Sequence, residues 1–173
     1  MHSRRRAILS VVLFLSLLTS ASTASAIGDD KYSRRSLKRL KKVAVVVQIE
    51  KPISEDFRKV GLTEERIRTG IELKLQELRI DVVHIENLPS DTPIFHVEMS
   101  GSRKSDKIFS FLIEVELWQK GTLKRDPQIE VVAATWSAGV FGLGSASTIA
   151  NDIMGWINGM MDTFVKAYSS VNS

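Results

Sequence analysis

The sequence predicts an exported α/β protein whose domain is a two-layer sandwich, with two helices on one face of a mostly antiparallel sheet of four to five strands. Three observations predict this fold: a short, almost wholly apolar run that suits a buried strand, two segments with helical periodicity, and several alternating runs between them. Their order along the chain is strand, helix, short strand, three strands and helix. Helices that pack on one face of a sheet give two layers.

The chain has 173 residues, of which 43% are apolar and 25% charged, and this is the composition of an ordinary globular protein with one domain. We expect residues 43–173 to form that domain. The sequence contains no cysteine, which excludes disulfide scaffolds, cysteine nucleophiles and cysteine-ligated metal sites.

Residues 1–26 have the three parts of a secretory signal peptide. Three arginines precede an apolar stretch at residues 7–18, and the small residues 24–26 form an A-x-A cleavage site. Twelve apolar residues, at about 1.5 Å of helical rise each, are too short to cross a hydrocarbon core about 30 Å thick. We therefore expect cleavage near Ala26 and a periplasmic or secreted protein without a transmembrane span, exported by the general secretory or the twin-arginine route.

Residues 27–42 form a basic leader before the first strand. From Val43 onward, acidic residues outnumber basic ones, so the leader concentrates the positive charge. A basic segment can bind an anionic membrane surface, which stays open as an alternative function beside a solvated lead-in or first helical turn. No nucleic-acid-binding motif accompanies it, and we expect no nucleic-acid partner. Its seven cations are Lys31, Arg34, Arg35, Lys38, Arg39, Lys41 and Lys42.

The first strand is expected at residues 43–49, where β-branched side chains follow one another. A mixed connector then runs from Pro52 to Gly61. The next helix begins at an N-cap, Thr63, and Gly70 within it predicts close packing against the sheet. Its apolar stripe consists of Ile67, Ile71, Leu75 and Leu78.

A short strand is expected at residues 80–85. Three alternating runs follow at residues 94–99, 109–118 and 129–136. Polar segments of hairpin length separate these runs, which predicts an antiparallel meander.

A glycine-rich segment connects the meander to the last helix, which is expected from a cap at Ser147 or Thr148 to about Tyr168. The segment lacks the Gly-Lys-Ser/Thr ending of a P-loop and the glycine order of a dinucleotide-binding fingerprint. It is interpreted as a flexible connection, or as a loop that holds an anion at the start of the helix. The second interpretation makes a small hydrolase or a ligand-binding protein the alternative function. The segment's named residues are Gly139, Gly142, Gly144 and Ser145.

Several titratable side chains are expected on the sheet face that the helices leave open. A metal site needs three or four converging ligands, whereas an exposed sheet face ordinarily carries such charges at alternate positions. We therefore predict no catalytic constellation, no cofactor and no metal. The side chains in question are His96, Glu98, Glu114 and Glu116.

The same open face is predicted to bind a protein partner or a second copy of the chain. A turn centred near Lys124 pairs Trp118 with Glu130 and Leu112 with Trp136. Large apolar side chains on a face that should be polar are typical of interfaces. The alternatives are that other segments cover these side chains, or that a β-bulge turns one tryptophan into the core. The predicted surface consists of Leu112, Trp118, Val132 and Trp136.

Three segments, GLTEERIRTGIELKLQELRI, AATWSAGVFGLGS and DTFVKAYSSVN, resemble a small family of uncharacterised exported bacterial proteins over most of residues 43–172. The order of strands and helices is also similar to that of periplasmic accessory domains of envelope-assembly systems. Many of those proteins are lipoproteins, whereas this chain has no cysteine to carry the lipid. The function predicted first is a non-enzymatic binding or accessory module that acts through its apolar sheet face.

Overall fold

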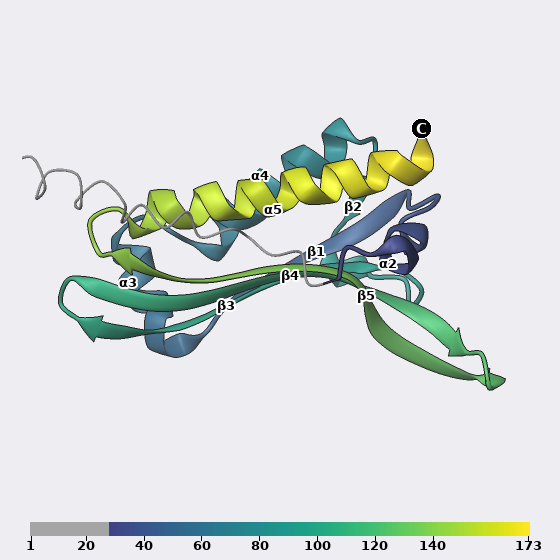
Figure 1. Ribbon diagram of the computed structural model, residues 1–173, viewed down its shortest axis with the longest axis horizontal. Helices are drawn as coiled ribbons and strands as arrows, with labels where there is room; N and C mark the ends of the chain where they lie inside the picture. Colours follow the sequence, from purple (N-terminus) through teal and green to yellow (C-terminus); the bar gives the residue numbers. More distant parts are fainter. Residues whose placement is uncertain (1–27) are drawn as a thin grey trace, which may run out of the picture.

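Figure 1 shows a computed structural model of the protein, which describes residues 28–173. The predicted signal peptide and its cleavage site lie outside the described residues. Five strands form one sheet in the order β2-β1-β3-β4-β5. The strands are β1 (Lys42–Ile49), β2 (Asp81–Val83), β3 (Ile94–Ser105), β4 (Ile108–Leu123) and β5 (Asp126–Ser145). The helices are α2 (Lys31–Ser36), α3 (Lys51–Lys59), α4 (Glu64–Glu77), the 3-10 turn η2 (Ile85–Asn87) and α5 (Ile149–Asn172).

The two halves of the sheet differ in strand direction. β1 pairs in parallel with both β2 and β3, whereas β3, β4 and β5 pair antiparallel in chain order. A helical crossover, here α4, is the usual connection between parallel strands such as β1 and β2. The predicted fold class, a two-layer α/β sandwich, is confirmed, and the sheet is mixed.

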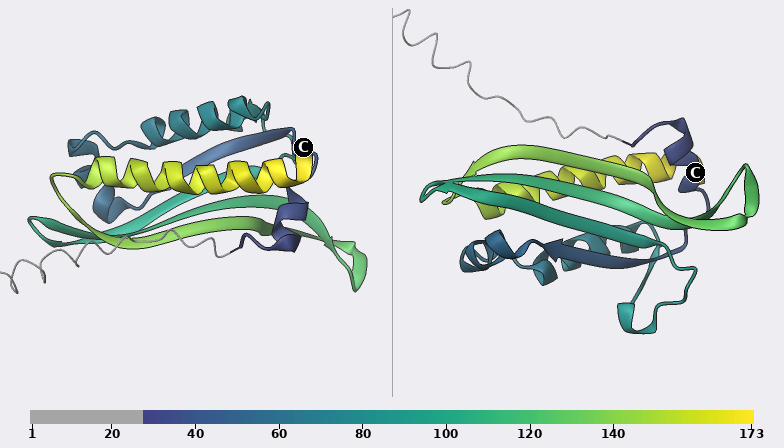
Figure 2. Two further views of the ribbon diagram at one scale, coloured as in Figure 1. Left: turned by 45° about the horizontal axis from the view of Figure 1, so that its top comes forward. Right: turned by 90° about the horizontal axis from the view of Figure 1, so that it is seen from below.

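α4 and α5 lie side by side over one face of the sheet, the inner face (Figures 1 and 2). Every second side chain of the strands is buried beneath them, because side chains alternate between the two faces of a sheet. The opposite face, the outer face, is not covered by helices over β3, β4 and β5 (Figure 2, right). The buried side chains of β3 and β4 are Phe95, Val97, Met99, Phe109, Phe111, Ile113, Val115 and Leu117.

The helix predicted to begin after Thr63 is α4. Thr63 Oγ1 accepts a hydrogen bond from the backbone N–H of Arg66 at 3.2 Å, which is the usual N-cap arrangement. A Cβ at Gly70 would lie 3.6 Å from Cε of Met154 in α5. The close packing predicted at Gly70 is therefore with the neighbouring helix and not with the sheet.

The connector expected between Pro52 and Gly61 contains a helix, α3. Ile53 and Phe57 lie about one turn apart in it and are both buried, and the Phe57 ring lies 5.9 Å from that of Phe109. A proline is tolerated in the first turn because the first helical N–H groups have no partner within the helix. Two apolar residues thus anchor α3 to the inner face.

Beyond the helices, β4 and β5 continue as a two-stranded arm, residues 120–133, which projects from the body of the protein (Figure 1). Its side chains are mostly exposed, including Ile129 and Val132. The arm starts next to a shift in the pairing of β4 and β5, and such irregularities bend a sheet.

Candidate functional site

Trp136 lies in the core and not on the outer face, which corrects the predicted partner-binding surface. Leu117 faces Trp136, whereas the next residue of β4, Trp118, faces Ala134. Thr135 is therefore the extra residue of a β-bulge, and the bulge changes the face on which the following residues lie. The turn near Lys124 lies where it was predicted, because Leu123 faces Asp126. The irregularities at Thr122/Leu123 and Leu117/Trp118 shift the rest of the pairing by four to five residues along β5.

The buried indole of Trp136 packs tightly, with only 1% of its surface exposed. Its ring centroid lies 6.4 Å from that of Phe95 and 5.1 Å from that of Phe164 on α5. The Nε1–H donates a hydrogen bond to Asp29 Oδ1 at 3.3 Å, and a buried indole N–H usually needs such an acceptor. Trp136 is thus a core residue that also joins β5 to the leader.

Of the other three residues predicted for the surface, Trp118 and Val132 lie diagonally across β4 and β5 on the outer face, because Trp118 faces Ala134 and Val132 faces Lys120. Leu112 lies apart from both. Leu112 faces Phe141 near the end of β5, whereas Val132 is in the arm. Trp118 is half-buried, and its Nε1–H donates to Glu116 Oε2 at 2.8 Å. Leu112 and Trp118 are six residues apart on β4, which is about 20 Å along a strand. The predicted four-residue surface is therefore not assembled as a whole, because Trp136 is buried and Leu112 is distant.

A different group of apolar side chains gathers on the outer face. Phe141 and Leu143 are 69% and 65% exposed, and Ile108 is 45% exposed. Strand pairing places Phe141 beside the partly buried Leu112. We call these four residues, Ile108, Leu112, Phe141 and Leu143, the outer apolar patch. Clustered large apolar side chains in water are a mark of interaction sites, so this patch is the candidate site.

The sequence pattern does not indicate this patch, because the glycines between Gly139 and Ser145 are typical of a loop. This segment is the end of strand β5, paired with β4, and α5 begins only at Ile149. A Cβ at Gly142 would lie 2.6 Å from Cζ of Phe111, and one at Gly144 would collide with Ile149. The glycines therefore allow close packing of the inner face. The segment predicted as a loop is therefore a strand, and the hydrolase or ligand-binding alternative stays a prediction.

Next to the patch, the middle of the outer face is acidic. Glu98 faces Glu114 across β3 and β4, and His96 faces Glu116. Glu114 and Glu116 also line a small hollow of about 110 Å³ over Gly139. Within residues 28–173, no three or more histidine or carboxylate side chains lie close enough to hold a metal ion.

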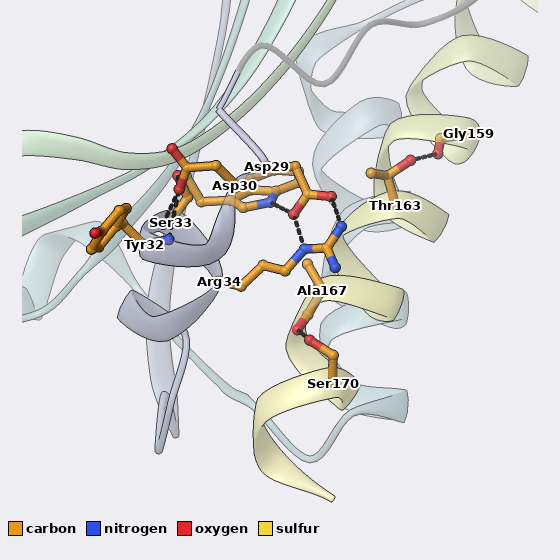
Figure 3. A network of polar contacts seen from close by, with 10 residues as sticks. Asp29, Asp30, Tyr32, Ser33, Arg34, Gly159, Thr163, Ala167 and Ser170 are labelled. Carbon is orange, nitrogen blue, oxygen red and sulfur yellow. Dashed lines mark hydrogen bonds and ion pairs between the residues drawn. The ribbon is translucent and has the colours of Figure 1, made fainter.

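The described part of the basic leader is attached to the fold at its beginning (Figure 3). The N–H of Gly28 donates to the carbonyl of Ser137 at 3.3 Å, at the edge of β5. Both carboxylate oxygens of Asp29 accept hydrogen bonds from Arg34, at 2.8 and 2.7 Å, and Figure 3 shows this pair beside the α5 residue Thr163.

The end of the leader is attached to α5. Leu37 and Leu40 are buried in the core. The side chain of Asn172 donates from Nδ2 to the carbonyl of Leu37 at 2.9 Å and accepts at Oδ1 from the N–H of Arg39 at 2.7 Å. The hydroxyl of Tyr168 donates to the carbonyl of Leu40 at 3.1 Å. The leader contains the expected helical turn, α2, and packs as part of the fold.

Asp30 is the N-cap of α2. Its Oδ1 accepts hydrogen bonds from the backbone N–H groups of Tyr32 and Ser33, at 2.7 and 2.8 Å. The hydrogen bond from the Ser33 N–H is the main reason why the pKa of Asp30 is lowered, followed by those from the Ser33 hydroxyl and the Tyr32 N–H. The pKa of Arg34 is raised, chiefly by its hydrogen bonds to Asp29.

Six of the seven leader cations are exposed, and Lys42 is partly buried. Arg34 pairs with Asp29 at 2.7 Å and Lys42 with Asp91 at 3.6 Å. Binding of the leader to an anionic membrane surface stays a prediction. Among the helices that the structure describes, none is both long and apolar enough to span a bilayer.

A hollow of about 940 Å³ lies at the carboxyl end of β1, between α3 and the start of α4. Ligands often bind at this end of parallel strands, and the sequence pattern did not predict a site here. Glu64 Oε1 accepts the N–H of Ile49 at 3.1 Å and so joins α4 to β1. The other charges are mixed in sign and indicate no ligand class. The lining residues are Gln48, Ile49, Glu50, Lys51, Ser54, Glu55, Arg58, Leu62, Thr63 and Glu64.

Comparison of the chain with protein-family models and with curated proteins finds no match. The resemblance to exported bacterial proteins therefore stays a prediction.

Proposed function

We propose that the protein is an exported, non-enzymatic binding module that docks a protein through the outer face of its sheet. The observation that supports this most directly is the exposure of Phe141 and Leu143 in the outer apolar patch. Burial of apolar surface contributes about 25 cal/mol per Å² removed from water, and aromatic side chains often dominate interface energies. Export is inferred from the predicted signal peptide.

The patch is held on rigid elements, which supports a docking role. Phe141 lies opposite Leu112 in a paired strand, and the inner face behind them is filled by Phe111, whose ring stacks 4.6 Å from that of Trp156 on α5. A surface that is already ordered loses little conformational entropy on binding. The patch can therefore use most of its burial energy for affinity.

The test compares two double variants of the tagged protein, purified from the exporting host after chemical cross-linking. Phe141→Ser with Leu143→Ser removes the two most exposed side chains of the patch. Ile129→Ser with Val132→Ser is the matched control, because it removes two exposed apolar side chains from the arm of the same strand. Thermal unfolding of both variants shows whether each one folds.

We expect the patch variant to lose its cross-linked companion, whether another protein or a second copy, while the arm variant retains it. The proposal is wrong if the patch variant folds and keeps the same companion, or if only the arm variant loses it.

A further inference from the structure

β5 is the outermost strand of the sheet, and its last part has a free backbone edge. The carbonyl of Ser137 accepts the N–H of Gly28 on the side away from β4. Backbone groups of successive strand residues point to opposite sides, so those of Gly139, Phe141 and Leu143 also point away from β4. In the part of the chain that the structure describes, no main-chain hydrogen bond joins these three residues to another segment at that edge.

This edge lacks the features that usually protect edge strands. Natural proteins place lysine, proline or a bulge on such edges to prevent pairing with other chains. Residues 136–145 contain no charged residue and no proline, and the β-bulge at Thr135 precedes them. An unprotected edge beside exposed apolar side chains is suited to the addition of a strand.

We propose that a second copy of the chain pairs antiparallel with this edge, about a two-fold axis beside Gly142. This inference rests on the proposed function and names its partner. The free stretch begins after Ser137, where Gly28 is bound, and ends at Ser145, whose carbonyl accepts the N–H of Thr148 at 3.0 Å. A two-fold axis at the middle of this stretch pairs its whole length with that of the second copy. The strand of each copy ends after Ser145, next to the position at which Gly28 already occupies the edge of the other copy.

The same axis brings the exposed apolar side chains together. Phe141 of each copy faces Leu143 of the second copy, and both side chains lie on the outer face. Directly opposed residues in an antiparallel pair have Cβ atoms about 5 Å apart. The four side chains at the axis, with Leu112 of each copy beside them, then form one apolar cluster on the outer face, in which adjacent side chains shield part of one another from water.

The charges at the two ends of the free stretch favour the antiparallel arrangement. Lys104 and Lys107, both exposed, lie at the end near Ser145, since the carbonyl of Lys107 accepts the N–H of Ala146 at 2.9 Å. Glu114 and Glu116 lie at the other end, around the hollow over Gly139. A two-fold axis places the basic end of one copy next to the acidic end of the other, whereas a parallel pairing would bring like charges together.

The test uses the full chain as the host exports it, with the N-terminus read by mass spectrometry and self-association measured by sedimentation over a concentration series. Leu143→Lys introduces a like-charged pair near the axis, and we expect at least about a tenfold weaker dimer. Val132→Lys is the matched control, since Val132 is similarly exposed on the same strand but lies in the arm. We expect it to leave the dimer unchanged.

A second pair of variants tests the register without altering the apolar cluster. Glu114→Lys places a positive charge at the end of the interface nearest Lys107 of the second copy, with each residue one strand behind the paired edge. At low salt this change weakens the dimer, and the further change Lys107→Glu in the same chain restores it. Circular dichroism shows whether each variant is folded.

A protein that stays monomeric at every concentration overturns the inference, as does a dimer that resists Leu143→Lys but dissociates with Val132→Lys. If the protein is monomeric and yet loses a different bound protein through Phe141→Ser with Leu143→Ser, the second-copy inference fails and the proposed function stands. If the patch variants affect neither dimer nor companion, both fail.

Discussion

The Phe111 ring occupies the space that a side chain at position 142 would need. A Cβ at Gly142 would lie 2.6 Å from the ring, whereas a Cβ at Gly121, in the arm, would meet no atom within 4 Å. We expect Gly142→Ala to lower the free energy of unfolding by about 1–3 kcal/mol, because a filled core resists added volume. Gly121→Ala should raise it by up to about 1 kcal/mol, because glycine is unfavourable within a strand.

Urea denaturation of both alanine variants measures these changes. Equal effects at positions 142 and 121 would contradict the packing that we assign to the glycine-rich segment.

Trp118 and Trp136, on paired strands, have different environments. Trp136 is buried between Phe95 and Phe164, whereas Trp118 is half-buried on the outer face. We expect Trp136→Ala to cost about 3–5 kcal/mol of stability, as for other large core truncations, and Trp118→Ala to cost about 1 kcal/mol. Chemical denaturation distinguishes them, and a larger loss at Trp118 would show that the bulge at Thr135 is misplaced.

At the scale of a single helix, the N-cap of α2 has a predictable response to acid. The pKa of Asp30 is lowered in the fold, so its cap stabilises α2 at a pH above the ordinary aspartate value of about 3.9. That contribution is lost as the pH falls through the lowered pKa. Asn is an equally good cap that does not titrate.

We therefore expect hydrogen exchange at the Ser33 amide to accelerate in strong acid in the wild type and much less in Asp30→Asn. Asp30→Ala should exchange rapidly at every pH. Identical acid responses of the wild type and the Asn variant would rule out the cap as the cause.

The elements predicted best from the sequence are those in which the spacing of buried apolar residues alone identifies the type of secondary structure. The stripe of Ile67, Ile71 and Leu75 predicts α4 because only a helix places these residues on one face, and the structure confirms it. α3 was missed because its two anchors, Ile53 and Phe57, are too few to establish a period next to a proline.

The end of β5 was missed for a different reason. Trp136, Ala138 and Val140 alternate as a strand should, but Gly142 and Gly144 continue the inner face without apolar side chains. Their role depends on Phe111 and on α5, which are distant in sequence. The bulge at Thr135 then reversed the faces, so the candidate surface could not be located from alternation alone. Leu112 was placed correctly on the outer face, whereas Phe141 and Leu143 required the register.

At the scale of the whole molecule, the leader and the last helix unite the two ends of the described chain. Leu37 and Leu40 are buried, and their carbonyls accept hydrogen bonds from Asn172 and Tyr168. Trp136 in the sheet is bound to Asp29 of the leader. Because these contacts join the leader to both layers, we expect the leader and the domain to unfold together.

Leu37→Ala should therefore destabilise the entire protein by about 2–5 kcal/mol, the usual cost of truncating a buried leucine. Lys38→Ala, at the adjacent exposed position, is the control and should change stability by less than about 0.5 kcal/mol.

Unfolding in urea is followed by tryptophan fluorescence, which reports on the core around Trp136, and by far-ultraviolet circular dichroism. Coincident transitions that shift together are expected for a single cooperative unit. If the two transitions of the Leu37→Ala variant do not shift together, and the dichroism transition stays at its wild-type position, the leader is an independent appendage. It would then be a separate basic tail.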